Sequence, residues 1–148
     1  MKKIIWLMMV LVLVVSGCAT NAPADTMSAA SLQVSDGTVN KTYTVETLKA
    51  LPETQASFKD VTYVGVKMTD LLTDAGFDPQ AIKAVKAVAS DGFTVNYDPS
   101  QFQREDVILA YQTADGALAA EDGNFRMVLP GEEGKLNARM VVEIQAVK

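Results

Sequence analysis

The chain has no histidine, and Cys18 is its only cysteine. Without histidine it lacks the usual general base near neutral pH, the commonest transition-metal ligand and every Ser-His or Cys-His nucleophile. Arginine is also scarce and occurs only at positions 104, 126 and 139. The 18 acidic residues outnumber the 13 basic ones. This acidic balance argues against a nucleic-acid partner, because phosphate binding requires clustered Lys and Arg.

Cys18 stands at the end of a segment with the features of a secretory signal. Lys2 and Lys3 precede twelve apolar residues, 4–15, and the small residues of Val15-Ser16-Gly17-Cys18 follow. An uncut membrane anchor is a weaker interpretation, because a helix needs roughly 20 apolar residues to span a bilayer; an ordinary signal with an incidental cysteine is the other alternative. The segment resembles the bacterial lipobox, whose cysteine receives a diacylglyceryl group. We therefore expect a lipid anchor on Cys18 at the extracytoplasmic face of a bacterial cell membrane.

The rest of the chain predicts a tether followed by one domain. Removal of the signal, residues 1–17, leaves 131 residues with a net charge of −7 and, apart from Cys18, no thiol for a disulfide. Residues 18–35 are rich in Ala, Ser and Thr and lack apolar periodicity, so they are expected to form a flexible tether. Residues 36–148 have the length of one domain with a single core.

Apolar patterning in this domain predicts strands that outnumber short helices. Residues 81–89 fit either a helix or a strand, and the Asp91-Gly92 dipeptide after them favours a strand that ends in a two-residue hairpin. Thr44 and Thr69 are the expected N-caps of the first two helices. The fold class is therefore α+β. The expected strands are 39–43, 58–66 (passing into a loop), 84–90, 93–97, 106–111, 125–129 and 138–147, and the expected helices are 45–51, 70–75 and 100–104.

Two groups of charged residues are candidates for chemistry. The adjacent acids Glu105-Asp106, Glu121-Asp122 and Glu132-Glu133 lie in or beside predicted turns, where solvated side chains are the ordinary role, so no metal site is predicted. Arg126 and Arg139 flank a break at Pro130-Gly131. If their strands are neighbours, two guanidiniums converge on an oxyanion site. The alternative is that each arginine pairs with a nearby acid, such as Glu121 or Glu143.

The order of several segments resembles the oxidoreductase molybdopterin-binding domain, which has the sulfite-oxidase-type fold. The segments are 45–52, 65–72 running on to Gly76, 90–93, 108–111, 123–131 and 139–144. The resemblance implies a molybdenum-binding cysteine on the segment before Gly65-Val66, yet residues 58–64 contain none. The family's Gly-Pro-x-Arg step is Gly123-Asn124-Phe125-Arg126 in this chain, and its Lys-Trp pair is Arg139-Met140.

These observations favour a non-catalytic, membrane-anchored module over an enzyme, since a carboxylate does not replace a soft thiolate at molybdenum. The expected partner is a small anionic ligand or an envelope protein. The ligand-binding candidates are Arg126, Arg139, Tyr63 and Asp91, and no metal or other cofactor is expected. The alternative is an oxidoreductase that binds molybdopterin without cysteine ligation and acts on a small oxyanion. A third hypothesis is an envelope-interaction module without a small ligand.

Overall fold

The computed structural model describes residues 30–148. The predicted signal peptide, the lipidation site at Cys18 and most of the predicted tether lie outside these residues. Within the described part of the chain, no helix is long and apolar enough to cross a membrane.

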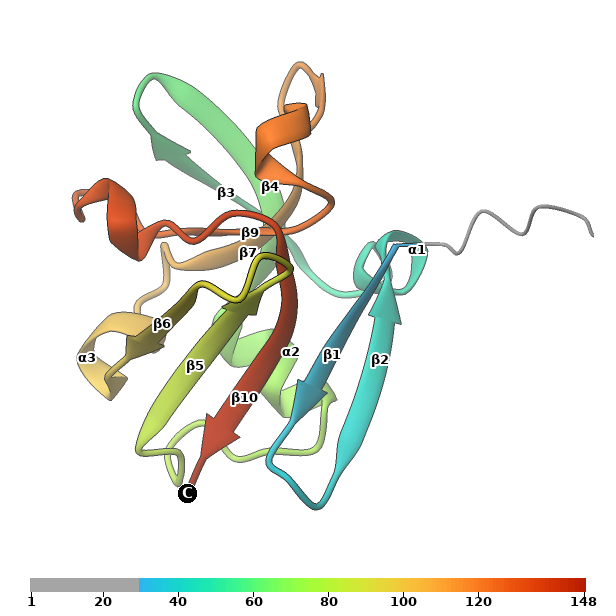
Figure 1. The fold of residues 1–148 in the computed structure, drawn as a ribbon, viewed down its shortest axis with the longest axis vertical. Helices are drawn as coiled ribbons and strands as arrows, with labels where there is room; N and C mark the ends of the chain where they lie inside the picture. The colour runs from blue at the N-terminus through green and yellow to red at the C-terminus, as the bar shows by residue number, and fades with distance from the viewer. Residues whose placement is uncertain (1–29) are drawn as a thin grey trace, which may run out of the picture.

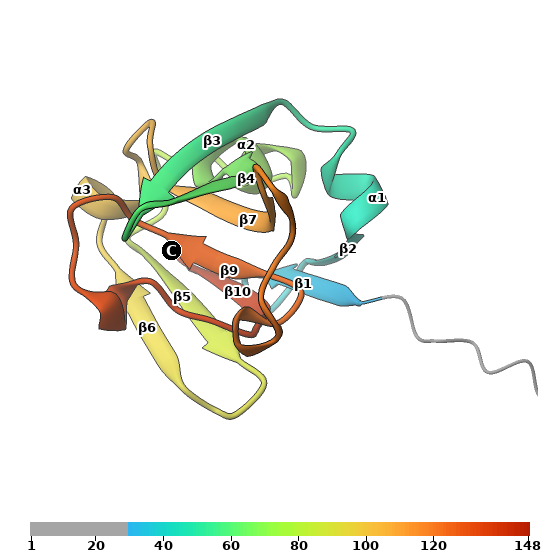
Figure 2. The same cartoon turned by 90° about the horizontal axis from the view of Figure 1, so that it is seen from above.

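The domain contains two five-stranded sheets. Figures 1 and 2 show how their strands are arranged. In the first sheet the order is β2-β1-β10-β5-β6, with β1 and β10 parallel and the other neighbours antiparallel. In the second the order is β3-β4-β7-β8, and β9 also pairs with β7. The strands are β1 (Ser31–Ser35), β2 (Asn40–Thr44), β3 (Glu53–Phe58), β4 (Val61–Lys67), β5 (Ala84–Ala89), β6 (Thr94–Tyr97), β7 (Ile108–Thr113), β8 (Gly116–Ala117), β9 (Arg126–Val128) and β10 (Val141–Val147).

The helices are short and connect or flank the strands. They are α1 (Val45–Leu48), α2 (Met68–Asp74), α3 (Pro99–Phe102) and the 3-10 helices η1 (Ala120–Asp122) and η2 (Gly134–Leu136). Figure 2 shows β3, β4 and β7 on one side of β10, β5 and β6. Fully buried side chains from both sheets, including Val34, Ile144 and Leu109, join in one hydrophobic core. The predicted α+β class, rich in strands with short helices, is confirmed.

Strand β1 extends the domain into the segment expected to be tether. Leu32 and Val34 on β1 are fully buried, and the strand pairs with both β2 and β10. The expected tether boundary at Ser35 is therefore too late. Strand β1 has only two apolar residues, among serines and a glutamine, so its sequence pattern is weak. Pairing with β2 and with the C-terminal strand β10 stabilises it.

A hairpin replaces the single strand expected at residues 58–66. Phe58 pairs with Val61 across a two-residue turn formed by Lys59 and Asp60, whose φ angles are 48° and 62°. Such a turn usually contains Gly or Asn because both central residues need positive φ. The sequence Lys-Asp gave no turn signal, so both the turn and strand β3 before it were missed.

Glycine at position 65 allows β4 and β7 to approach closely. A Cβ at Gly65 would lie 2.0 Å from the carbonyl oxygen of Leu109, and the register shifts between Val64 and Gly65. A glycine inside a strand commonly marks such a close approach. This contact helps to position β4, which carries Tyr63.

The cap predictions were correct for the first helix and wrong for the second. Thr44 caps α1, and its hydroxyl accepts a hydrogen bond from the N–H of Thr47. Helix α2 begins two residues earlier than expected, and its N-cap is Lys67, which makes no side-chain cap. Thr69 lies inside the helix, where its carbonyl accepts a hydrogen bond from Thr73 Oγ1.

The strand prediction for 84–90 is confirmed by β5, while the turn after it is longer than expected. The N–H of Ala89 donates to Phe93 O, which leaves a three-residue loop. Gly92 takes a φ of 86° in this loop, and Asp91 Oδ1 accepts the N–H of Phe93. Asp91 therefore stabilises the three-residue, bulge-type turn of the β5–β6 hairpin.

The other expected strands and the last helix appear with shifted ends. Strand β7 begins two residues after the expected position because Asp106 binds Arg104 in the preceding loop. Strand β10 begins at Val141 instead of residue 138, since Met140 has a φ of 51° and breaks the extended backbone.

Candidate functional site

A cavity of about 920 Å³ lies where the β3–β4 hairpin, the β5–β6 turn, η1, β9 and the segment before β10 meet. All four predicted ligand-binding residues line it: Tyr63, Asp91, Arg126 and Arg139. They come from four separate parts of the chain, so their convergence is produced by the fold. The volume lies in the range of small-molecule sites.

Arg126 contributes a buried guanidinium to the lining, and the group is already bonded to protein. Its Nη1 donates hydrogen bonds to Asp122 Oδ1 at 2.7 Å and to Tyr63 Oη at 2.8 Å. The side chains of Arg126 and Asp122 are each only 6% exposed. The guanidinium also lies 4.5 Å from the centre of the Tyr63 ring and 5.8 Å from that of Phe58. We call this buried group, Asp122, Arg126 and Tyr63, the cavity floor.

Asp122 is a cavity residue that the sequence patterns do not reveal. They predict a solvated turn acid at this position and offer Glu121 as a partner of Arg126. Instead, η1 turns Asp122 inward while Glu121 remains exposed. The spacing of four residues between Asp122 and Arg126 was the available signal, although it predicts contact only when the intervening backbone is known.

The cavity floor is close to electrically neutral. The charges of Asp122 and Arg126 offset each other, and burial raises the pKa of Tyr63, so its hydroxyl stays protonated at neutral pH. Within residues 30–148, Arg126 Nε is a buried donor that has no hydrogen-bond partner.

The cations that remain for a ligand lie at the rim of the cavity, on Lys59, Lys135 and Arg139. Arg139 is exposed and forms no ion pair with the described residues. Lys135 pairs at 2.8 Å with the equally exposed Glu133, an interaction that raises the pKa of Lys135. Lys59 Nζ would lie 3.9 Å from a Cβ on Gly134, so the hairpin tip approaches η2.

Apolar side chains complete the rim. Phe93 and Val61 line the cavity and are 48% and 38% exposed, and Phe58 lies beside them in the lining. Exposed aromatic and branched side chains next to a cavity are available to contact an apolar part of a ligand.

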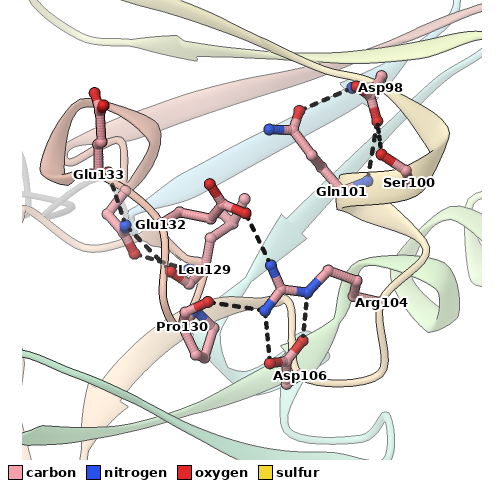
Figure 3. A network of polar contacts seen from close by, with 10 residues as sticks. Asp98, Ser100, Gln101, Arg104, Asp106, Leu129, Pro130, Glu132 and Glu133 are labelled. Carbon is pink, nitrogen blue, oxygen red and sulfur yellow. Dashed lines mark hydrogen bonds and ion pairs between the residues drawn. The ribbon is translucent and has the colours of Figure 1, made fainter.

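A separate group of polar contacts holds the loop that carries Lys135 (Figure 3). Arg104 binds Asp106 through two nitrogens at 2.8 and 2.9 Å, and it also reaches Glu132 and the carbonyl of Pro130. Inside the same loop, Asn137 accepts a hydrogen bond from the N–H of Leu129 at 2.7 Å. We call these contacts of Arg104 and Asn137 the loop clamp.

The side-chain groups in the cavity lining that could ligate a metal are carboxylates, hydroxyls, an amide and amines, with one thioether at Met140. No group of three or more acidic residues in residues 30–148 is placed to hold a metal ion. The third arginine, Arg104, belongs to the loop clamp and does not line the cavity.

Comparisons with known proteins agree on the fold. The chain matches the sequence model of the oxidoreductase molybdopterin-binding domain over residues 10–148. Among solved structures, it is similar to the sulfane dehydrogenase SoxCD from Paracoccus pantotrophus, with a TM-score of 0.67 and 22% sequence identity. That likeness covers 79% of this chain and 38% of the SoxCD chain, so this chain spans well under half of its length. No curated protein matches the sequence. The chain therefore belongs to the oxidoreductase molybdopterin-binding domain family.

Proposed function

We propose that this chain is a lipid-anchored protein on the extracytoplasmic face of a bacterial membrane, and that its molybdopterin-oxidoreductase-type domain binds a small anionic ligand without catalysing a redox reaction. The observation that carries the ligand proposal is the cavity rim. Three of the eleven basic residues among residues 30–148 lie at this rim in an acidic domain, and Arg139 among them has no ion pair with the described residues. The lipobox-like segment that ends at Cys18 supports the anchor.

The family's cofactor is the first ligand to consider, and its metal does not fit the residues of this cavity. The resemblance implies a cysteine thiolate near Tyr63, whereas the lining contains no thiol. Where a metal requires soft thiolate, the carboxylate and hydroxyl groups present here are not equivalent ligands. We therefore propose binding without molybdenum chemistry, with Lys59, Lys135 and Arg139 attracting the anionic group of the ligand.

Anion titration of the full-length protein in detergent tests the ligand proposal. Sulfate and phosphate serve as probes, followed by calorimetry and by the shift in melting temperature. We expect Arg139→Gln to weaken binding about ten- to hundredfold, because a charge-assisted hydrogen bond contributes roughly 1.5 to 3 kcal/mol. Lys83→Gln is the matched control, since Lys83 is exposed and lies outside the cavity. Absence of binding, or equal weakening in both variants, contradicts the proposal.

Two further measurements test the anchor and the absence of redox chemistry. Incorporation of labelled fatty acid into the wild-type chain and its loss in Cys18→Ser are expected if the cysteine is lipidated. Metal analysis of the protein purified from its own host is expected to find no stoichiometric molybdenum. Stoichiometric molybdenum would favour the alternative, an oxidoreductase that binds the cofactor without cysteine.

A further inference from the structure

The buried ion pair of the cavity floor places a carboxylate of the protein against the guanidinium of Arg126. Both side chains line the same cavity, and each is 6% exposed. A guanidinium this deeply buried requires a counter-charge, because an unpaired buried charge is strongly unfavourable. In a binding cavity that counter-charge can come from the ligand. In this chain it comes from Asp122.

The backbone holds Asp122 in place independently of its ion pair. Its N–H donates to the carbonyl of Ala119 at 2.9 Å, and its own carbonyl accepts the N–H of Met140 at 2.8 Å. The first bond closes the turn of η1, and the second fastens η1 to the segment just before β10. The next residue, Gly123, has a φ of 71°, and a Cβ there would lie 2.9 Å from Met140 Cα. The backbone at residues 122 and 123 is therefore fixed by contacts other than the ion pair, and it directs the carboxylate toward Arg126.

We propose that Asp122 is an internal anion that fills an anion-binding position on Arg126 and so determines where in the cavity a ligand's charge is accepted. With that position filled by the chain, the anionic group of a ligand binds at the rim, among Lys59, Lys135 and Arg139. The part of the ligand that reaches the floor is then an uncharged group. The choice of ligand rests on the proposed function, while the anion position on Arg126 does not.

Removal of the Asp122 carboxylate tests this assignment directly. Asp122→Ala leaves out a group whose closest free equivalent is formate. We expect formate to raise the melting temperature of Asp122→Ala saturably, with a half-saturation concentration at least about tenfold below that of any formate effect on the wild type. Chloride at equal ionic strength controls for general salt effects. The double variant Asp122→Ala/Arg126→Gln is the matched control and is expected to lose the formate response.

If Asp122→Ala does not fold in the absence of formate, recovery of the folded signal on adding formate becomes the readout. Asp122→Ser, whose shorter side chain also leaves the carboxylate position empty, provides a second background for the same formate titration. An absent response in both variants, or an equal response in the double variant, overturns the assignment. Loss of anion binding at the rim of the wild-type cavity would contradict the proposed function and leave this result unchanged, so the two failures are distinguishable.

Discussion

The cavity floor and the loop clamp both place an arginine between acceptors, but they differ in exposure to water. Arg126 and Asp122 are almost fully buried, whereas the side chains of Arg104, Asp106 and Glu132 are 31%, 48% and 33% exposed. Water screens the second group and can replace either partner. In the first group neither partner can be removed without leaving a buried charge. The bond lengths in the two groups are similar, but the stability of the fold is expected to depend more on Arg126 than on Arg104.

The largest difference is expected when one partner of the buried pair is removed. Arg126→Met leaves Asp122 buried without its counter-charge, which should lower the free energy of unfolding by about 3 to 5 kcal/mol. Urea denaturation measures this loss. The double variant Asp122→Leu/Arg126→Met removes both charges and should recover most of it. A loss below about 1 kcal/mol in the single variant would show that the floor tolerates an unpaired carboxylate.

Asn137 tests how the clamped loop is held from inside. Its amide bonds the backbone of Leu129 and the carbonyl of Glu133, and the residue is 2% exposed. Asn137→Ala leaves buried backbone groups without partners, so we expect a loss of roughly 1 to 3 kcal/mol in the same denaturation experiment. Asn124→Ala is the matched control because Asn124 is exposed. Equal effects of the two substitutions would contradict the role given to Asn137.

Arg104 tests the half-exposed side of the comparison. We expect Arg104→Ala to cost about 1 kcal/mol, and the cost to shrink at high salt because solvent and ions screen the pairs. Denaturation at low and high salt measures both quantities. Arg139→Ala, at an exposed arginine that forms no ion pair within residues 30–148, should change stability by less than about 0.5 kcal/mol. A cost for Arg104 as large as that for Arg126 would remove the distinction between the two regions.

The smallest effect is expected at Asp98, beside the loop clamp (Figure 3). Hydrogen bonds from Ser100 and from the backbone N–H of Gln101 lower the pKa of Asp98. Because its folded pKa lies below the unfolded value of about 3.9, Asp98 stabilises the fold above that pH and loses this contribution as the pH falls. Comparison of wild type with Asp98→Asn at pH 7 and pH 3 should show a small advantage at pH 7 that is smaller at pH 3. An advantage of equal size at both pH values would contradict this ionic contribution.

Sequence patterns predicted most of the elements because the apolar residues alternate with polar ones where a single face is buried. β5 is the clearest case, with alternate residues buried along its length. The errors occurred where backbone conformation or a distant strand decides the outcome. Lys59 and Asp60 adopt positive φ without a glycine, and β1 has only two apolar side chains to announce it.

The sequence predicted four residues that line the cavity, but it did not predict the ion pair between Arg126 and Asp122. Tyr63, Asp91, Arg126 and Arg139 do line one cavity, and ligand binding by them stays a prediction. Two free guanidiniums do not converge in the structure. The alternative, in which an arginine pairs with a nearby acid, holds for Arg126, although its partner is Asp122 and not Glu121. Three of these four residues lie in a turn or next to the start of a strand. At such positions the spacing of residues along the chain does not predict which side chains point into the protein.

The sequence by itself determined the absence of histidine, the single cysteine at position 18 and the α+β pattern of the domain, because composition and periodicity are properties of the chain alone. It also determined membership of the family through the order of its segments. Only the tertiary structure decided that Arg126 is neutralised while Arg139 remains exposed. The physical reason is burial. A charged side chain loses its hydration when distant segments pack around it, and it then needs a partner of opposite charge. No local sequence pattern specifies which side chains are buried in this way.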